Sequence, residues 1–546
     1  MSFNVVTFSV FLALILLITG MGFVASRWRR ASDHDNLDEW ALGGRTFGPF
    51  ITWFLLGGDL YSAYTLIAVP AAIFSMGAFG FYSIPNAIVL YTLGFLFLPK
   101  LVRLAHTHGY VTLTDFVNDR FGSKSLSLAI TTVGLLAILP YLALQLVGLE
   151  VIFGSLGIGG NPDSHWFIKD LPLLIAFGVL AAYTYSSGLR APALIAFVKD
   201  TLTYIVVIVA VIYIPYRLGG FETVFTRASE ALAEKELAGP TDIDPALRVD
   251  PMIYLTLALG SGMAFFLYPH AITGAFASRG AKTIRRNMSV LPIYTVLLGF
   301  VAMLGLMALA AGVQPIGGNP QYAVPQLFAQ MLPSWFTGVA YAAIAMSALV
   351  PAAIMAIAAG NLVSRNIYRQ FAGGRVTSSS ETLVSKLVSV LVKAGALVVV
   401  LTLDKTFALN FQLLGGIWIL QTLPTVLFGL FTVRLVDRRA LLAGLLVSVV
   451  YGTWAAYEVK TATGQPFGGS TATPFFLDSP IYIAISALVV NVLVVALGSV
   501  LLRLVSTPRT GRTSSDDRIS VPFTSPEPAP TTVGNRPVTI REVDTP

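Results

Sequence analysis

The stretch FLLGGDLYSAYTLIAVP, residues 54–70, decides the fold because it is an apolar helix that carries its own interruption. Gly57 and Gly58 weaken the helix, Asp59 stands beside them, and Pro70 follows in the same apolar run. Inside a membrane, interrupted backbone is tolerated only where it lines a cavity or binds a ligand. The stretch therefore predicts a spanning helix that is broken at a binding site, with Asp59 as a cation or proton group.

A second interrupted stretch, ALGSGMAFFLYPHAITGAF at residues 258–276, lies five spans further along. It contains a Gly-Ser-Gly cluster at 260–262, Pro269 and His270, which is either a proton carrier or a satisfied buried polar group. Two interrupted helices at matching places in two five-helix units are typical of inverted-repeat secondary transporters, whose site lies near the bilayer midplane.

About thirteen stretches are apolar and long enough, or nearly so, to span a membrane. They cover residues 4–25, 49–76, 79–100, 126–154, 169–186, 191–216, 251–278, 290–313, 334–363, 384–403, 407–433, 439–458 and 479–502. The first lacks a basic segment before it and a clear cleavage site, so we expect a retained helix and not a signal peptide. The sequence thus predicts an all-α polytopic membrane protein.

Composition agrees with this class. The chain has 546 residues, of which 55% are hydrophobic and 12% charged, whereas about 25% charged is usual in a soluble protein. Absence of cysteine excludes a disulfide framework, an iron–sulfur cluster and a thiolate zinc site. The motifs GxxxxGK[ST], HExxH and GxSxG are absent, so we expect neither an enzyme nor a bound cofactor.

The distribution of Lys and Arg predicts the orientation. One set of alternate connections holds about nineteen of these residues and the other about seven, and the basic set faces the cytoplasm. This places the N-terminus outside the plasma membrane and the C-terminus inside. The net charge of +7 is then explained by topology, and no nucleic-acid partner is expected.

The expected organisation has six parts. They are an extra helix and basic cytoplasmic loop at 1–48, a first five-helix repeat at 49–218, an acidic extracytoplasmic loop with a short surface helix at 219–250, a second five-helix repeat at 251–435, two peripheral helices at 436–503 and a disordered cytoplasmic tail at 504–546.

Few other ionisable residues fall at membrane depth. Adjacent residues on a helix point about 100° apart, so we expect Asp200 to face the bundle as a coupling group while Lys199 reaches toward the cytoplasmic face. Glu150 near a span end is expected to be interfacial, and Lys393 is not expected to have a role in transport.

At this point the sequence resembles the sodium:solute symporter family over nearly its whole length apart from the tail. The segments that carry the resemblance are LGGRTFGPF (42–50), GYVTLTDFVNDRFGS (109–123), YLALQLVGLEVIFG (141–154), YTYSSGLRAPALIAFVKD (183–200), YPHAITGAFAS (268–278) and SRNIYRQF (364–371). The runs GGDLYSAYTLIAVP, SALVPAAIMAIAAGNLVSRNIY and LNFQLLGGIWILQTLP look like the monocarboxylate-permease branch.

The resemblance implies a LeuT-like core of five plus five helices with alternating access. It implies a Na⁺ site made by the carbonyls of Gly58 and Tyr61, with Ser347 as a further oxygen. The family's Ser/Thr pair falls here on Val350 and Pro351, and Lys199 replaces the Thr of its Thr-Asp pair. Coupling is therefore expected to use either Na⁺ at this site or H⁺ carried by Asp59, Asp200 or His270.

For the substrate, the resemblance implies a short monocarboxylate such as acetate, pyruvate, lactate or propionate. We expect half-helix amides at Gly57 and Gly58 to face the anion. The other expected contacts are hydroxyl and amide side chains: Tyr61, Ser62, Tyr64, Gln145, Tyr268 and Gln412. The remaining expected partner is membrane lipid, and the oligomeric state stays open.

Two alternatives remain at the level of the sequence. One is a sodium-coupled amino-acid or sugar symporter of the same family. The other is a transporter-like sensor, which is disfavoured because no kinase-like domain follows residue 503.

Overall fold

The computed structural model describes residues 3–25, 37–158, 171, 173–175, 177–178, 188–234, 250–372, 376–403, 405, 408–461 and 463–505. By contacts the chain divides into two units, Met1–Arg512 and Thr513–Pro546. All described residues belong to the first unit. The expected tail from residue 506 onward, and most of the predicted span 169–186, lie outside the described residues.

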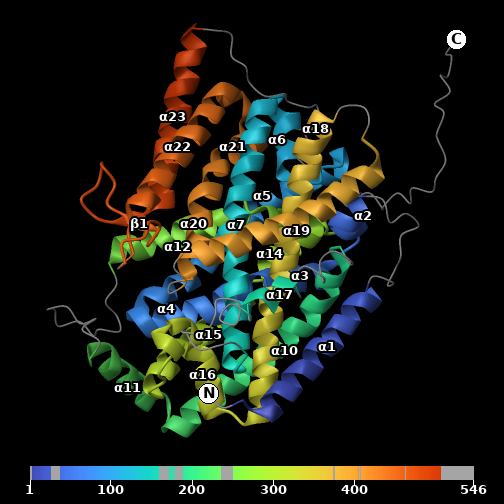
Figure 1. Cartoon of the computed structure of the whole chain (residues 1–546). Helices are drawn as coiled ribbons and strands as arrows, with labels where there is room; N and C mark the ends of the chain where they lie inside the picture. The colour runs from blue at the N-terminus through green and yellow to red at the C-terminus, as the bar shows by residue number, and fades with distance from the viewer. Residues whose placement is uncertain are drawn as a thin grey trace. The chain divides into compact units, whose positions relative to one another are not determined.

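The fold is helical, with one two-stranded sheet in the described part (Figure 1). Elements up to the long external loop are α1 (Val5–Ala25), α2 (Leu37–Leu42), η1 (Gly43–Arg45), α3 (Pro49–Leu60), η2 (Tyr64–Ala68), α4 (Val69–Met76), η3 (Gly77–Tyr82), α5 (Ser83–His108), α6 (Leu113–Phe121), α7 (Lys124–Ser155), α10 (Arg190–Leu218) and α11 (Phe221–Glu234).

Beyond that loop the chain continues with a second series of elements. They are α12 (Pro251–Phe265), α13 (Pro269–Phe276), α14 (Ala281–Val290), α15 (Ile293–Ala310), η5 (Ile316–Gly318), η6 (Pro320–Tyr322), α16 (Ala323–Met331), α17 (Ser334–Val363), η7 (Ser364–Tyr368), α18 (Arg369–Phe371), α19 (Ser378–Thr402), α20 (Leu409–Ile419), η9 (Leu420–Thr422), α21 (Leu423–Phe431), η10 (Val433–Leu435), α22 (Arg438–Glu458), β1 (Thr471–Ala472), β2 (Ile481–Tyr482) and α23 (Ile483–Val505).

The helices confirm a multi-pass membrane protein. Within the described residues, ten helices are long and apolar enough to cross a membrane, or eleven when the bent pair α12 and α13 counts as one span. The expected number of thirteen is not confirmed, because the stretch from η2 to α5, Tyr64–His108, counts as one candidate span of 45 residues. Within this stretch Gly77 leaves the helical conformation with φ 63°, between the predicted spans 49–76 and 79–100. The predicted span 169–186 cannot be compared.

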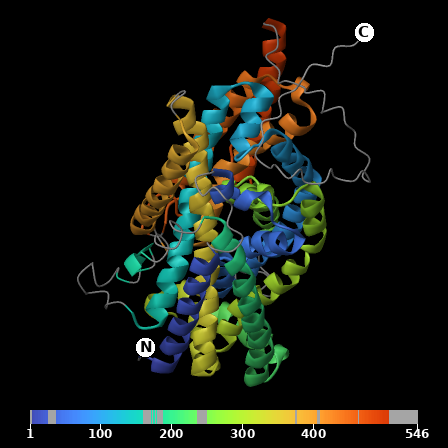
Figure 2. The same ribbon diagram turned by 90° about the vertical axis from the view of Figure 1, so that its right-hand side faces the viewer.

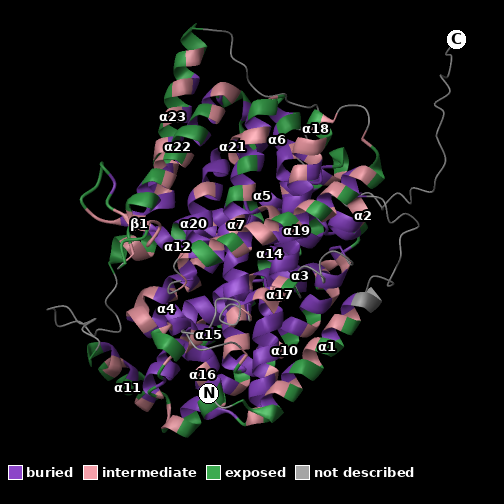
Figure 3. Ribbon diagram, in the orientation of Figure 1, coloured by how far each residue is buried: buried purple, intermediate pink, exposed green. Residues whose placement is uncertain are grey.

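The buried centre of the bundle consists of α7, α17 and α20, with α7 packed against both of the others (Figure 3). Small residues dominate α17, in the run AYAAIAMSALVPAAIMAIAAG, and allow neighbouring helices to approach closely. Exposed apolar side chains lie instead on outer helices such as α1 and α23. In a membrane protein this outer apolar surface is the one that contacts lipid.

Two peripheral features complete the fold. Helix α1 packs along α17 and α10 in both views (Figures 1 and 2), and the Asn4 amide donates to the Ser334 hydroxyl where α1 and α17 begin. Helices α22 and α23 pair with each other, and β1 and β2 form a short antiparallel ladder between them. The expected surface helix of the acidic loop is present as α11.

The first expected interruption lies between α3 and η2. Helix α3 begins at Pro49, where the missing N–H costs nothing, and ends at Leu60. Tyr61 then leaves the helical conformation with φ −84° and ψ 74°, and a single π-helical turn, η2, leads into α4. Turns of this type are frequent at functional sites.

The second interruption separates α12 from α13, which meet at an angle of 48°. Asp250 caps the start of α12 by accepting from two backbone amides, and Pro269 starts α13 after Phe266, Leu267 and Tyr268. The beginning of α3 is joined to the end of α13 by two backbone hydrogen bonds, Phe47 N to Ala277 O at 3.2 Å and Arg279 N to Phe47 O at 2.8 Å. The two broken helices therefore lie next to each other.

Candidate functional site

The break after α3 is held by side chains from two neighbouring segments. The amide N–H of Ala63 donates to Gln145 Oε1 at 3.1 Å, and the amide of Tyr64 donates to Ser62 Oγ at 3.2 Å. Gln145 belongs to the buried part of α7, and its Nε2 donates to Tyr141 O. Gln145 and Ser62 therefore act as hydrogen-bond acceptors for backbone amides that the interruption frees.

The sequence predicted a break at Gly57 and Gly58, but both residues lie inside α3. A Cβ at position 57 would lie 2.4 Å from Cζ of Tyr294, and one at position 58 would lie 2.9 Å from Asp200 Oδ2. These glycines are small to let other groups approach the helix, and the conformational break comes at Tyr61–Ala63. Their amides belong to the α-helical segment and do not mark the start of a half-helix.

Lys199 and Asp200 lie together on α10 at this break, and both side chains are completely buried. Lys199 Nζ donates to Gly58 O at 2.5 Å and to Tyr61 O at 2.9 Å, and forms an ion pair with Asp200 Oδ1 at 2.8 Å. The prediction that Lys199 extends to the cytoplasmic face is wrong. Carbonyls freed near the helix break attract the ammonium inward, where the adjacent carboxylate compensates its charge.

Asp59 contacts the second broken helix. Its Oδ2 lies 3.3 Å from Nε2 of His270, the second residue of α13. Both side chains are buried, and the rings of Tyr141 and Tyr268 each lie 5.3 Å from the imidazole, measured between centroids. The structure thus brings together Asp59 and His270, two of the proposed coupling groups, across the two interruptions.

Ser347 does not join the carbonyls of Gly58 and Tyr61 directly. Its hydroxyl hydrogen bonds to Thr203 at 3.2 Å, and Thr203 lies one turn beyond Lys199 on α10. Val350 and Pro351 are buried in α17 and supply no side-chain oxygen. Among the described residues, no group of three or more His, Cys, Asp or Glu side chains is arranged to hold a metal ion.

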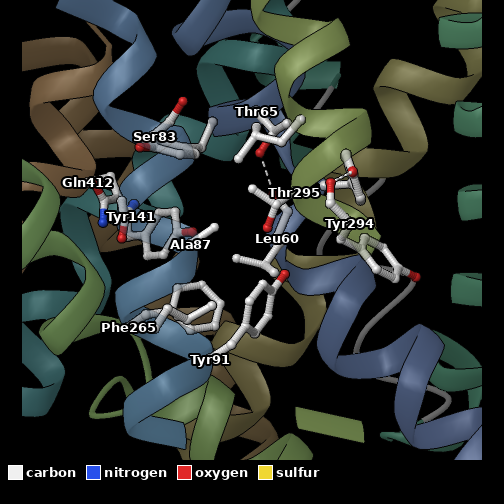
Figure 4. Close-up of a pocket in the computed structure, with 15 residues that line it drawn as sticks. Leu60, Thr65, Ser83, Ala87, Tyr91, Tyr141, Phe265, Tyr294, Thr295 and Gln412 are labelled. Atoms are coloured by element: carbon white, nitrogen blue, oxygen red, sulfur yellow. Dashed lines mark hydrogen bonds between the residues drawn. The ribbon is translucent and has the colours of Figure 1, made fainter. Parts of the chain in front are cut away.

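A cavity lies beside the first break (Figure 4). Its lining combines hydroxyl and amide groups with apolar side chains, and it comes from the region around the break and from α5, α7, α12, α15 and α20. Tyr91, Thr295 and Gln412 lie around it together with Leu60 and Phe265. The chemistry of this lining suits a small molecule that has one polar end and a short apolar part.

The predicted substrate residues divide into two groups. Tyr61, Tyr64 and Gln412 line the cavity, whereas Gly57, Ser62, Gln145 and Tyr268 do not. Tyr268 contacts the backbone of a lining residue, since its hydroxyl donates to Gln412 O at 3.0 Å. The amides of Gln412 and Asn86 both donate to Ser261 Oγ at 3.3 Å, so the Gly-Ser-Gly cluster of α12 orients two of the lining side chains.

The family model of sodium:solute symporters matches residues 40–447. This chain belongs to the sodium:solute symporter family. The symporter is 47% identical over 475 residues to the monocarboxylate transport permease protein of Rhizobium johnstonii, covering 85% of this chain and 93% of the relative. It is 25% identical over 480 residues to the sodium/proline symporter of Salmonella typhimurium, covering 83% and 89%. The resemblance expected from the sequence is confirmed.

The fold of the symporter is also similar to a solved structure, the substrate-bound outward-open state of a Na⁺-coupled sialic acid symporter. The TM-score is 0.70 at 14% identity, and the match covers 94% of this chain and 100% of that chain. At this identity the similarity concerns the fold alone. It supports the expected LeuT-like arrangement of helices, and the family consists of transporters of small molecules and not of enzymes.

Several residues of the symporter's site were not found from the sequence. Asn86, Tyr91, Tyr141 and Thr295 line the cavity from spans that carry no charge or interruption at those positions, so no local signal singles them out. Lys199 was noticed as an ionisable group at membrane depth, but its side chain was predicted to extend to the cytoplasmic face, whereas it points to the carbonyl of Gly58. A buried lysine next to a broken helix is a signal that favours contact with the freed carbonyls.

The other two ionisable residues that the sequence placed at membrane depth, Glu150 and Lys393, lie elsewhere. Glu150 pairs with Lys405 at 2.8 Å, and both side chains are partly exposed, as expected for an interfacial pair. Lys393 is buried in α19, and its Nζ has no hydrogen-bond partner among the described residues. Neither residue lines the cavity at the break.

Proposed function

We propose that the symporter imports short monocarboxylates, such as acetate, pyruvate, lactate and propionate, by alternating access, driven by a gradient of Na⁺ or H⁺. It acts in the plasma membrane with its N-terminus outside and its C-terminus in the cytoplasm. The repeats at 49–218 and 251–435 surround the site, and the helices at 436–503 lie outside the core. The basic connections predicted to face the cytoplasm support this orientation.

The observation that carries the proposal is the composition of the cavity. Tyr64, Tyr91 and Thr295 offer hydroxyl groups, which donate to a carboxylate, and the amides of Asn86 and Gln412 add further donors. Apolar groups such as Leu60, Leu90 and Phe265 form the rest of the lining and suit a short carbon tail. The 47% identity to a protein named as a monocarboxylate permease supports the same substrate class.

The alternative of a sodium-coupled amino-acid or sugar symporter rests on the similarity to a sodium/proline symporter. An amino acid brings a primary or, in proline, a secondary ammonium group, which is most readily bound by a carboxylate. Among the described residues that line the cavity there is no Asp or Glu. The lining therefore favours an anion without a cationic group.

The test is uptake of labelled pyruvate by the full-length chain in proteoliposomes, with unlabelled competitors. We expect acetate, lactate and propionate to inhibit uptake, and proline and galactose to have no effect. Tyr91→Phe should raise the KM for pyruvate about three- to tenfold, because one hydrogen bond to the anion is lost. Inhibition by proline, or no competition among monocarboxylates, would contradict the proposal.

A matched control variant is Tyr341→Phe. Tyr341 donates to Pro325 O at 2.8 Å from the buried face of α17 and does not line the cavity. This variant also loses one tyrosine hydroxyl group, but away from the cavity, and should keep the KM of the unchanged protein. A similar rise of KM in both variants would show that Tyr91 acts through general packing.

A further inference from the structure

The ammonium of Lys199 is surrounded by three oxygens at the first helix break. It donates hydrogen bonds to Gly58 O and Tyr61 O at 2.5 and 2.9 Å, and Asp200 Oδ1 lies 2.8 Å away as its ion-pair partner. The side chain is completely buried, so its charge is not shared with water. The two carbonyls are the ones that the family resemblance assigns to the coupling Na⁺.

We propose that the ammonium of Lys199 takes the place of the coupling sodium ion, so that the symporter works without sodium. The inference rests on the proposed function for the identity of the substrate. Its statement about sodium binding concerns the helix break alone and can be tested without a substrate.

The oxygens that remain near this position are too few for sodium. Hard cations are held by oxygen ligands in numbers of about six or more, and aliphatic side chains supply none. Val350 and Pro351 stand where the family has hydroxyl side chains, and the hydroxyl of Ser347 already bonds Thr203. With Gly58 O and Tyr61 O bound to Lys199, the expected set loses its two backbone ligands as well.

Filled space and occupied oxygens exclude a second cation at the same point. A Cβ added at Gly58 would lie 3.2 Å from Lys199 Nζ and 2.9 Å from Asp200 Oδ2, so the ion pair fills the volume against α3. A cation entering there would find the two carbonyls and the carboxylate already occupied by the ammonium. The position beside Gly58 is therefore occupied by the ammonium of Lys199, and a free cation has no room there.

A chain of hydrogen bonds joins the Lys199–Asp200 ion pair to residues that line the cavity. Tyr294 donates its hydroxyl to Asp200 Oδ2 at 3.1 Å, and its backbone carbonyl accepts from the Tyr61 hydroxyl at 2.5 Å. Tyr61 and Tyr294 both line the cavity. Lys199 thus stabilises the broken backbone that presents Tyr61 to the cavity.

The first experiment compares sodium chloride with choline chloride at equal ionic strength on the purified full-length chain. We expect the same midpoint of thermal unfolding in both salts, and initial rates of labelled pyruvate uptake that agree within about twofold, since an ion that binds the native state would raise stability. A rise of about 2 °C or more in sodium alone, or uptake that requires sodium, would overturn the inference.

The second experiment removes the ammonium with Lys199→Thr, which leaves the two carbonyls and the Asp200 carboxylate without their cation. We expect the variant to unfold at a lower temperature than the unchanged protein in choline chloride and to recover part of the loss in sodium chloride. An unfolding midpoint equal to that of the unchanged protein in choline chloride would contradict the inference. If the variant does not fold, the first experiment still decides the question.

Lys405→Thr is the matched control, because Lys405 also pairs with a carboxylate, that of Glu150, away from the helix break. It should show no recovery that is specific to sodium. The two proposals fail separately: absence of pyruvate uptake in every salt would refute the proposed substrate, while the unfolding midpoints would still report on sodium binding.

Discussion

At the scale of single residues, the interrupted backbone is stabilised by side chains that replace the missing helical hydrogen bonds. Gln145 accepts from the amide of Ala63, Ser62 accepts from that of Tyr64, and Lys199 donates to the carbonyls of Gly58 and Tyr61. In a membrane an unsatisfied backbone group is costly, so each of these contacts has a larger effect than its single hydrogen bond suggests.

Gln145 offers a direct test of this principle. Gln145→Leu removes the acceptor for Ala63 N–H, and we expect a loss of about 1–3 kcal/mol in stability together with slower uptake. Gln145→Glu keeps an oxygen at the same place and should retain most of the stability. Thermal unfolding and initial uptake rates measure both effects, and equal losses in the two variants would argue against the acceptor role.

Gly57 is predicted to be needed for close packing. Gly57→Ala places a Cβ 2.4 Å from Cζ of Tyr294, and overpacking of this kind costs about 1–3 kcal/mol. Gly20→Ala in α1 is the control, because its added Cβ has no heavy atom within 4 Å beyond the neighbouring backbone of its own helix. A lower unfolding midpoint is expected for the first variant only, and a Gly57→Ala protein as stable as the parent would refute the packing role.

At the scale of elements, the sequence predicts which helices are interrupted but not the residue at which each break lies. The Gly-Gly pair at 57–58 indicated a break, yet α3 continues to Leu60, because these glycines serve close approach to α10 and α15. In the second helix, Pro269 lies directly after the break, since proline favours the first turn of a new helix. A proline located the break more closely than glycines did.

The contact between the two interrupted helices can be tested by a double-mutant cycle on Asp59 and His270. We expect the losses in uptake rate for Asp59→Asn and His270→Gln to be non-additive by about 0.5–3 kcal/mol, because the side chains are in contact at 3.3 Å. As a control, Asp59→Asn and Glu150→Gln should add within about 0.5 kcal/mol, since Glu150 pairs elsewhere. Additive losses for the first pair would exclude energetic coupling between the breaks.

At the scale of the whole molecule, hydropathy was sufficient to predict a multi-pass helical bundle and most of its helices. Contacts between distant helices were not predictable, because a lone apolar helix does not show which of its faces meets a neighbour. This is why Tyr91 and Thr295, which lie on different spans without local signals, entered the site only through the structure. It is also why the predicted direction of the Lys199 side chain was wrong, since its partners lie at the end of α3 and are distant in the sequence.

The proposed orientation can be tested because the natural chain has no cysteine. Thr107→Cys, near the end of α5, and Thr463→Cys, between α22 and β1, are both exposed positions. In intact cells we expect a membrane-impermeant maleimide to label the second variant and not the first, which should react only after permeabilisation. Labelling of Thr107→Cys in intact cells would reverse the topology.

The two-point attachment of α3 to α13 has a mechanical consequence. Phe47 is joined by backbone hydrogen bonds to Ala277 and Arg279 at one end, and Asp59 meets His270 at the other. Because α3 contacts α13 near both of its ends, we expect the two half-helices to move together in the proposed transport cycle. Bending should then be concentrated at Tyr61–Ala63 and Phe266–Tyr268, where the helices are interrupted, and Gln145 and Lys199 stabilise the first of these segments.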